Sequence, residues 1–264
     1  MRFFIDTTMT RALILAPLAV CTALLLAFVF LVPGMQISRT RCEPAKTSSE
    51  TAVSVPKAVP TFRRRDDLGN ILESEGMQVG AELGVQAGHF AKAILSRWTS
   101  CRKYVLVDLW RQQQHYKDLA NVDNERQEKL YRETLKNLER WSTKTEVCRN
   151  YTSICAAQYP DEYFDYVFLD ARHDFKGVEQ DLTNWWPKVK PNGIMAGHDY
   201  LTHADVAPTG QDWTLNYDGT RDTTGTIVQG AVDKFFMSGN STTNPHYRQV
   251  IVSYRADDTW AVRK

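Results

Sequence analysis

The chain has 264 residues, of which 43% are hydrophobic and 24% are charged. This is enough apolar material for one sizeable core, and it predicts a single globular domain with additional segments. Because 32 Lys and Arg residues nearly balance 31 Asp and Glu residues, the net charge of +1 disfavours a protein that binds nucleic acid.

The first element in the chain is an apolar segment, residues 12–32, which follows a short N-terminal tail of residues 1–11. Its 21 residues carry no charge, and at about 1.5 Å per residue a helix of this length spans the roughly 30 Å core of a bilayer. We therefore expect a single-pass transmembrane signal-anchor. A cleaved signal peptide is the alternative, but its apolar region is usually about 7–15 residues long and ends in a small-residue cleavage site. The sequence after residue 32 offers no good site of this kind.

Signals for the compartment of the domain conflict. Basic residues flank the apolar segment on both sides, and the positive-inside rule leans slightly towards a cytosolic domain. Two N-glycosylation sequences, at Asn150 and Asn240, would matter only in a secretory lumen. We expect a lumenal domain in the endoplasmic reticulum or Golgi. The five cysteines form no C-x-x-C pair, so they predict neither a zinc site nor a disulfide scaffold, and incidental thiols are the simplest interpretation.

Residues 33–61 are rich in Ser, Thr, Pro and Ala and predict a flexible stalk, so the folded domain is expected over residues 62–264. Strands and helices then alternate. Helices are expected at 66–75, 89–98, 124–141, 153–159, 175–189 and 226–236. Strands are expected at 79–85, 103–110, 145–151, 164–171, 193–200, 247–254 and 258–264.

This alternation predicts an α/β fold, a Rossmann-like sheet of seven mostly parallel strands that is covered by helices on both faces. Only a few residues join the last two strands. A crossover between parallel strands needs about a dozen residues or more, so this connection is expected to be a hairpin. The otherwise parallel sheet should therefore contain one antiparallel strand, formed by the C-terminal part of the chain.

Functional residues are expected beyond the carboxyl ends of the strands, where open α/β sheets bind ligands. The first strand delivers Glu82, Gly84 and Gly88 in the string AELGVQAGHF, and its glycines allow the backbone to approach a ligand. A G-x-G-x-x-G fingerprint is absent, which disfavours a nicotinamide-dependent oxidoreductase. The second strand ends in Asp108, whose carboxylate could accept hydrogen bonds from both ribose hydroxyls of a nucleoside. Capping of a helix or turn is the alternative role for Asp108.

The strings ELGVQAG, VDLW and FDYVFLDARHDFKGVEQDLTNWWPKVKPNGIMAGHDY resemble the class I methyltransferases that use S-adenosylmethionine. More narrowly, they are similar to small O-methyltransferase-like domains, including sugar O-methyltransferases, with a D-x-x-H after strand four and a GHDY-type end to strand five. The resemblance covers about residues 66–263. It implies that the methionine end of the cofactor is lined by Glu82, Gly84 and Gly88. It also implies that Asp108 holds the ribose of the cofactor and that the adenine lies near Ser153. A glycan on Asn150 would obstruct this cofactor site, so we expect that sequon to be unused.

One departure from the family pattern is Asn192, which stands where the family shows a glycine; Asn tolerates the left-handed conformation.

Two acidic residues, Asp170 and Asp199, end the fourth and fifth strands, and His198 precedes the second of them. Carboxylate oxygens, completed by water and a substrate diol, suit Mg²⁺ or another divalent cation, which would lower the pKa of the hydroxyl to be methylated. His173 lies three residues after Asp170 and is a natural general base. His198 is the candidate third ligand. Related sequences carry an acidic residue at its position, so a structural or substrate-contacting role is the stronger interpretation there.

Alternative roles remain open for Asp170 and His173 as well. Asp170 could orient the cofactor or cap a helix, and His173 could anchor a loop. Between residues 200 and 225 the sequence has no periodicity, and loops of this length are often lids. Within it, Trp213 and Tyr217 could stack on a sugar or a phenolic ring, or could hold the loop in place.

Together these observations predict a membrane-anchored, S-adenosylmethionine-dependent O-methyltransferase that acts on a hydroxyl of a small molecule or glycan. A catalytically inactive, anchored binding module of the same fold is the alternative. An inactive relative would be expected to lose some of the site residues, whereas this chain keeps Glu82, Asp108, Asp170, His173 and Asp199.

Overall fold

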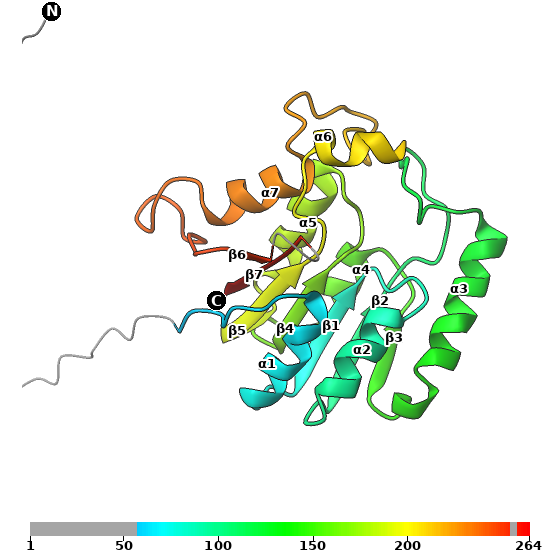
Figure 1. Ribbon diagram of the computed structural model, residues 1–264, viewed down its shortest axis with the longest axis vertical. Helices are drawn as coiled ribbons and strands as arrows, with labels where there is room; N and C mark the ends of the chain where they lie inside the picture. Colours follow the sequence, from blue (N-terminus) through cyan, green and yellow to red (C-terminus); the bar gives the residue numbers. More distant parts are fainter. Residues whose placement is uncertain (1–56, 254–257) are drawn as a thin grey trace, which may run out of the picture. The chain divides into compact units, whose positions relative to one another are not determined.

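A seven-stranded sheet with helices on both faces organises residues 57–253 and 258–264, which are the residues that the computed structural model describes (Figure 1). The strands are β1 (Val79–Leu83), β2 (Lys103–Val107), β3 (Thr145–Cys148), β4 (Phe164–Leu169), β5 (Val189–Gly197), β6 (Ile251–Ser253) and β7 (Thr259–Arg263). The α-helices are α1 (Leu68–Ser74), α2 (His89–Arg97), α3 (Asn124–Asn137), α4 (Thr152–Ala156), α5 (Phe175–Trp185), α6 (His203–Val206) and α7 (Ile227–Phe236). Short 3₁₀ helices are η1 (Arg65–Asp67), η2 (Glu139–Trp141) and η3 (Ala207–Thr209).

The strand order is β3-β2-β1-β4-β5-β7-β6. The pairs among β1 to β5 are parallel, whereas β7 runs antiparallel to both of its neighbours, β5 and β6. The predicted fold class and the single antiparallel strand are therefore confirmed. In this order β1 and β4 lie at the centre, so the ends of β1, β2, β4 and β5 form one continuous stretch of the sheet rim.

The central strands are apolar on both sides because each face of the sheet is covered. On one face, Val167 and Leu169 of β4 pack in the cluster that includes residues of α4, α5 and α7. On the other face, Tyr166 and Phe168 of β4 pack in the cluster that includes residues of α1 and α2. Figure 1 shows α1 and α2 in front of the sheet and α4 and α5 behind it. Two buried layers fix the sheet and thereby the positions of the polar residues at its rim.

The helices begin where short polar side chains can cap them. Asp123 precedes α3 and its carboxylate accepts a hydrogen bond from the amide of Arg126 at 2.8 Å. Asp174 precedes α5 in the same way and accepts from the amide of Gly177 at 3.0 Å. Such caps satisfy amides that have no partner within the helix. Because Asp174 fixes the start of α5, it also fixes the short connection from β4 that carries Asp170 and His173.

The cysteine interpretation was wrong for one pair. Cys148 at the end of β3 and Cys155 in α4 form a disulfide, with their Cα atoms 6.1 Å apart. The tight connection between β3 and α4 brings the two thiols within bonding range, although their spacing matches no common motif. Cys101 is a buried free thiol, and burial raises its pKa to about 12.

The predicted membrane segment, residues 12–32, and the tail before it lie outside the described residues, as does the stalk up to residue 56. Within residues 57–253 and 258–264, no helix has the length and apolar character needed to cross a membrane. The segment after β5, predicted to lack periodic structure, contains α6 and η3. The hydroxyl and backbone amide of Thr202 pair with the carboxylate of Asp205 at the start of α6, and this local pairing needs no hydrophobic periodicity.

Candidate active site

The ends of β1, β2, β4 and β5 open into one cleft of about 1090 Å³. Seven of the predicted site residues line it: Glu82, Gly84, Asp108, Asp170, His173, His198 and Asp199. Gly88 and Ser153 are not among the described residues that line the cleft, and at the start of α4 Thr152 lines it instead of Ser153. The acidic side chains of four different strands therefore share one crevice, as predicted.

A sharp turn after β1 shapes one side of this cleft. Gly84 has φ of +85°, and a Cβ atom there would lie 1.9 Å from the carbonyl oxygen of Asp170. Only glycine tolerates both the left-handed backbone and so close an approach. Gly88 also has a positive φ, +74°, and directly precedes α2. Gly84 thus allows the close approach of β1 to β4 and lines the cleft. Gly88 allows the turn at the start of α2.

Asp108 ties this turn to the end of β2. Its Oδ2 accepts hydrogen bonds from the amides of Val85 and Gln86 at 2.8 and 2.9 Å, and its Oδ1 accepts from the amide of Trp110 at 2.8 Å. The structure therefore shows Asp108 in the alternative role, as the cap of a turn. Burial raises the pKa of Asp108, whereas the three backbone hydrogen bonds act to lower it. Asp108 also lines the cleft.

Glu82 lies deeper, within β1. Its carboxyl accepts a hydrogen bond from the hydroxyl of Tyr104 at 3.0 Å, and the residue is 1% exposed. Burial raises the pKa of Glu82 well above its usual value, and the hydrogen bond from Tyr104 only partly offsets this effect. The side chain is thus a buried, protonatable group at the floor of the cleft.

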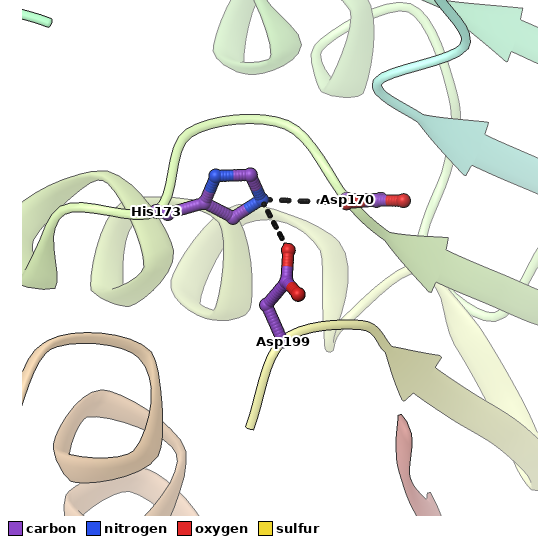
Figure 2. Close-up of side chains that lie close together, drawn as sticks. All are labelled: Asp170, His173 and Asp199. Carbon is purple, nitrogen blue, oxygen red and sulfur yellow. Dashed lines mark hydrogen bonds and ion pairs between the residues drawn. The ribbon is translucent and has the colours of Figure 1, made fainter. Parts of the chain in front are cut away.

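His173 lies at the centre of the polar cluster on the other side of the cleft. Its Nε2 is 3.3 Å from Oδ1 of Asp170 and 3.3 Å from Oδ2 of Asp199, and Figure 2 shows this nitrogen facing both carboxylates. Its Nδ1 is 2.8 Å from the hydroxyl of Tyr116 and 3.2 Å from Oδ2 of Asp118. Every polar atom of the ring therefore has a partner, which fixes the orientation of the imidazole.

The ring is also held by packing. The indole of Trp213 lies against it, with centroids 4.3 Å apart, and Trp213 is buried. Burial alone would lower the pKa of His173, but the neighbouring carboxylates, Asp118 first, raise it well above its usual value. Trp213 thus packs within the protein, which matches the alternative role of holding the loop in place, whereas Tyr217 is 42% exposed and lines the cleft.

His198 lies beside this cluster and outside its centre. Its Nδ1 is 3.1 Å from Oδ1 of Asp199 and 4.0 Å from Oδ1 of Asp170. The groups in the described part of the chain that could hold a metal ion are Asp170, His173 and Asp199, whose ligand atoms all lie within 4.8 Å of one another. Two carboxylate oxygens and one imidazole nitrogen fit a divalent cation. The structure thus assembles two of the predicted ligands, with His173 in the place predicted for His198.

Three contributors to the cluster were missed from the sequence. Tyr116 and Asp118 lie in the connection between β2 and α3, and the side chain of Asp118 is 4% exposed. This connection meets the segment after β5, because the amide of Asp212 donates to the carbonyl of Lys117 at 2.9 Å. The third contributor is Arg65, which precedes α1 and donates from Nη1 to Oδ2 of Asp170 at 3.0 Å. The length of the β2–α3 connection was the one available signal, since long connections are often functional.

Comparison with known proteins agrees with the fold. Residues 81–200 match a family model described as a methyltransferase domain. A candidate caffeoyl-CoA O-methyltransferase from Staphylococcus aureus has a similar structure, with a TM-score of 0.50 and 14% identity over 78% of this chain and 85% of its own. A protein from Corynebacterium glutamicum has a TM-score of 0.51 and 11% identity over 76% of this chain and 78% of its own. At these identities, the two structures show a common fold.

Over the matched residues the chain is thus similar to methyltransferase domains. No protein of curated function matches the sequence.

Proposed function

We propose that the chain is an O-methyltransferase that moves the methyl group of S-adenosylmethionine to a hydroxyl of a small molecule or glycan. The observation that carries the proposal is the cluster of Asp170, His173 and Asp199, which lies across one cleft from the glycine turn of β1. Such a cluster offers carboxylates that can bind a diol or a cation and a nitrogen that can accept a proton. In the reaction a new C–O bond forms as the C–S bond of the sulfonium breaks.

For the cofactor, we propose that Glu82 and Gly84 face its methionine end and that Asp108 faces its ribose. Support comes from their place in the cleft wall. Because Asp108 already accepts three backbone hydrogen bonds, it would hold the ribose through its remaining lone pairs. Gly88 and Ser153 do not line the cleft in the described structure, so their proposed roles are indirect, through the start of α2 and of α4 respectively.

For the acceptor, we propose that Asp170 and Asp199 would hold a divalent cation, with His198 supporting Asp199. When bound, this cation would lower the pKa of the acceptor hydroxyl. His173 is held in place by Tyr116 and Asp118 on one side of its ring and by Trp213 on its face. We propose that the neutral imidazole takes the hydroxyl proton at Nε2, and that the cleft brings the oxygen in line with the methyl group.

The test of this function is the formation of S-adenosylhomocysteine by the purified full chain when S-adenosylmethionine and a panel of sugars and catechols are supplied. Product that requires both the acceptor hydroxyl and Asp199 would support the proposal, with Asp199→Asn as the variant. Tight cofactor binding without product would instead favour the inactive binding module. Calorimetry on Asp108→Ala separates the two steps, because the loss of cofactor affinity is expected there regardless of the acceptor.

We also propose that the domain resides in the lumen of the secretory pathway. The Cys148–Cys155 disulfide supports this, because such bonds persist mainly in oxidising compartments. Asn240 lies exposed in the loop after α7, whereas Asn150 is half-buried in the wall of the cleft. We therefore expect a glycan on Asn240 and none on Asn150. The membrane anchor at residues 12–32 remains a prediction.

Glycosidase treatment of the chain from eukaryotic cells checks this placement. The gel mobility should shift on treatment, the shift should disappear in Asn240→Gln, and Asn150→Gln should behave as the unmodified chain does. An untreated chain that already runs at the mobility of Asn240→Gln would place the domain elsewhere.

A further inference from the structure

The arginine that reaches into the acidic side of the cleft comes from outside the sheet. Arg65 lies in η1, directly before α1, and its Nη1 donates to Oδ2 of Asp170 at 3.0 Å. Its guanidinium carbon lies 5.2 Å from the centroid of the Phe90 ring in α2. The side chain is 31% exposed. The contact with Phe90 directs the guanidinium into the cleft, because an arginine stacks favourably on an aromatic face.

The backbone that presents Arg65 is held in place. The carboxylate of Asp67 accepts hydrogen bonds from the amides of Arg63 and Arg64 at 3.0 and 3.1 Å. Leu68, which follows η1, is fully buried. Arg63 and Arg64 are themselves exposed. Of the three consecutive arginines, only Arg65 therefore lies in the cleft wall, and it does so from a fixed position.

Asp170 divides its two oxygens between two different partners. Oδ1 faces Nε2 of His173 at 3.3 Å, on the side where Asp199 also lies. Oδ2 faces Arg65. A guanidinium keeps its positive charge at every physiological pH. Asp170 is thus at once a candidate metal ligand and the partner of a permanent cation.

A divalent ion bound between Asp170 and Asp199 would lie close to the positive charge of Arg65. The two carboxylates balance the charge of the ion, and Arg65 adds one positive charge only a few ångströms away. Like charges at such a separation repel strongly in a partly buried site. The ion must therefore either displace the guanidinium from Asp170 or bind beside it at a cost in affinity.

We propose that Arg65 is a built-in cation that competes with a divalent metal ion for Asp170 and so weakens metal binding at the Asp170–His173–Asp199 group. This rests on the metal part of the proposed function. It makes Arg65 the residue that sets how readily the ion is exchanged.

The test is a titration of the purified full chain with Mn²⁺, followed by calorimetry and by the paramagnetic resonance signal of free Mn²⁺. Arg65→Gln should bind Mn²⁺ about tenfold or more tightly than the unmodified chain. Arg65→Lys, which keeps the charge, should remain closer to the unmodified chain. Arg63→Gln removes the same charge from an exposed neighbour and is the matched control, with no change expected. Thermal unfolding confirms that each variant is folded.

Three results would overturn the proposal. One is equal or weaker Mn²⁺ binding by Arg65→Gln, including no binding at all. Another is an equal gain in Arg63→Gln, which would indicate a general effect of surface charge. The third is a gain that persists when Asp170→Asn is added to Arg65→Gln, because the ion would then bind elsewhere. None of these readings uses methyl transfer, so a failure of the proposed function and a failure of this inference are distinguishable.

Discussion

The two sides of the cleft are built in different ways. The proposed cofactor side is made by one short turn after β1, which is tied to the end of β2 by two backbone hydrogen bonds to Asp108. The proposed acceptor side gathers side chains from five separate segments: Arg65, Tyr116 with Asp118, Asp170 with His173, Asp199, and Trp213. A local turn leaves a motif in the sequence, whereas an assembly of distant residues does not. This difference predicts that substitutions on the proposed cofactor side act mainly by disturbing the backbone. Substitutions on the proposed acceptor side should act mainly by changing the charge of the cluster.

The largest effect is expected at Gly84, where the cofactor side depends on the backbone. Gly84→Ala places a Cβ atom 1.9 Å from the carbonyl of Asp170 at a left-handed residue, and should cost about 3–5 kcal/mol of unfolding free energy. Denaturant unfolding measures this cost. Gly76→Ala is the matched control, since Gly76 has φ of +67° but no described neighbour within 4 Å of the added atom, and it should cost only about 1 kcal/mol. Equal costs would mean that the approach of β1 to β4 is not tight.

The next effect is expected at the centre of the acceptor side. His173→Gln removes the nitrogen that faces both carboxylates and should lower kcat by about 10²- to 10³-fold, with the affinity for S-adenosylmethionine nearly unchanged. Steady-state kinetics measures kcat, and calorimetry measures the affinity for S-adenosylmethionine. His246→Gln is the control, because His246 stacks on Phe235 and does not line the cleft in the described structure. Full activity in His173→Gln would assign the ring to loop anchoring alone.

A smaller effect is expected at Asp181, which lines the cleft from α5 and accepts a hydrogen bond from the hydroxyl of Thr152. Burial raises the pKa of Asp181 to about 7, so the folded state keeps a proton that the unfolded state loses near pH 4. Its contribution to stability is therefore present at low pH and is lost as the pH rises from about 4 to about 7.

Asp181→Asn cannot ionise and should flatten this dependence. Relative to the unmodified chain it should gain about 1–3 kcal/mol of unfolding free energy between pH 4.5 and pH 8. Denaturant unfolding at both pH values checks the sign. Asp161→Asn is the control, because Asp161 is exposed and pairs with Lys188 at the surface, and it should show no such gain. A gain of the opposite sign in Asp181→Asn would mean that the folded state holds this carboxylate ionised.

Much of the fold was available from the sequence because its signals are local. Alternating apolar strands and helices predicted the sheet, and the short final connection predicted the antiparallel β7. The prediction that an Asn could adopt the left-handed conformation at residue 192 is confirmed by its φ of 65°. Asp170 and Asp199 could be placed together because they end strands that pair side by side.

The rest depends on tertiary contacts that leave no period or motif. Asp118 lies 55 residues before His173 in the chain, in a connection without regular structure, and nothing local marks it as a partner of the imidazole. In the sequence Arg65 belongs to a run of three arginines, and its bond to Asp170 spans 105 residues. The Cys148–Cys155 disulfide was missed because its spacing is shared with many unpaired cysteines. Charge and thiol pairing across the fold require coordinates.

The most direct test of the shared cleft is a crystal structure of the full chain with S-adenosylhomocysteine and a divalent ion. We expect the sulfur to lie between the turn at Gly84 and the group formed by Asp170, His173 and Asp199, with the ribose hydroxyls at Asp108. A cofactor bound elsewhere, or one whose sulfur points away from this group, would contradict the account.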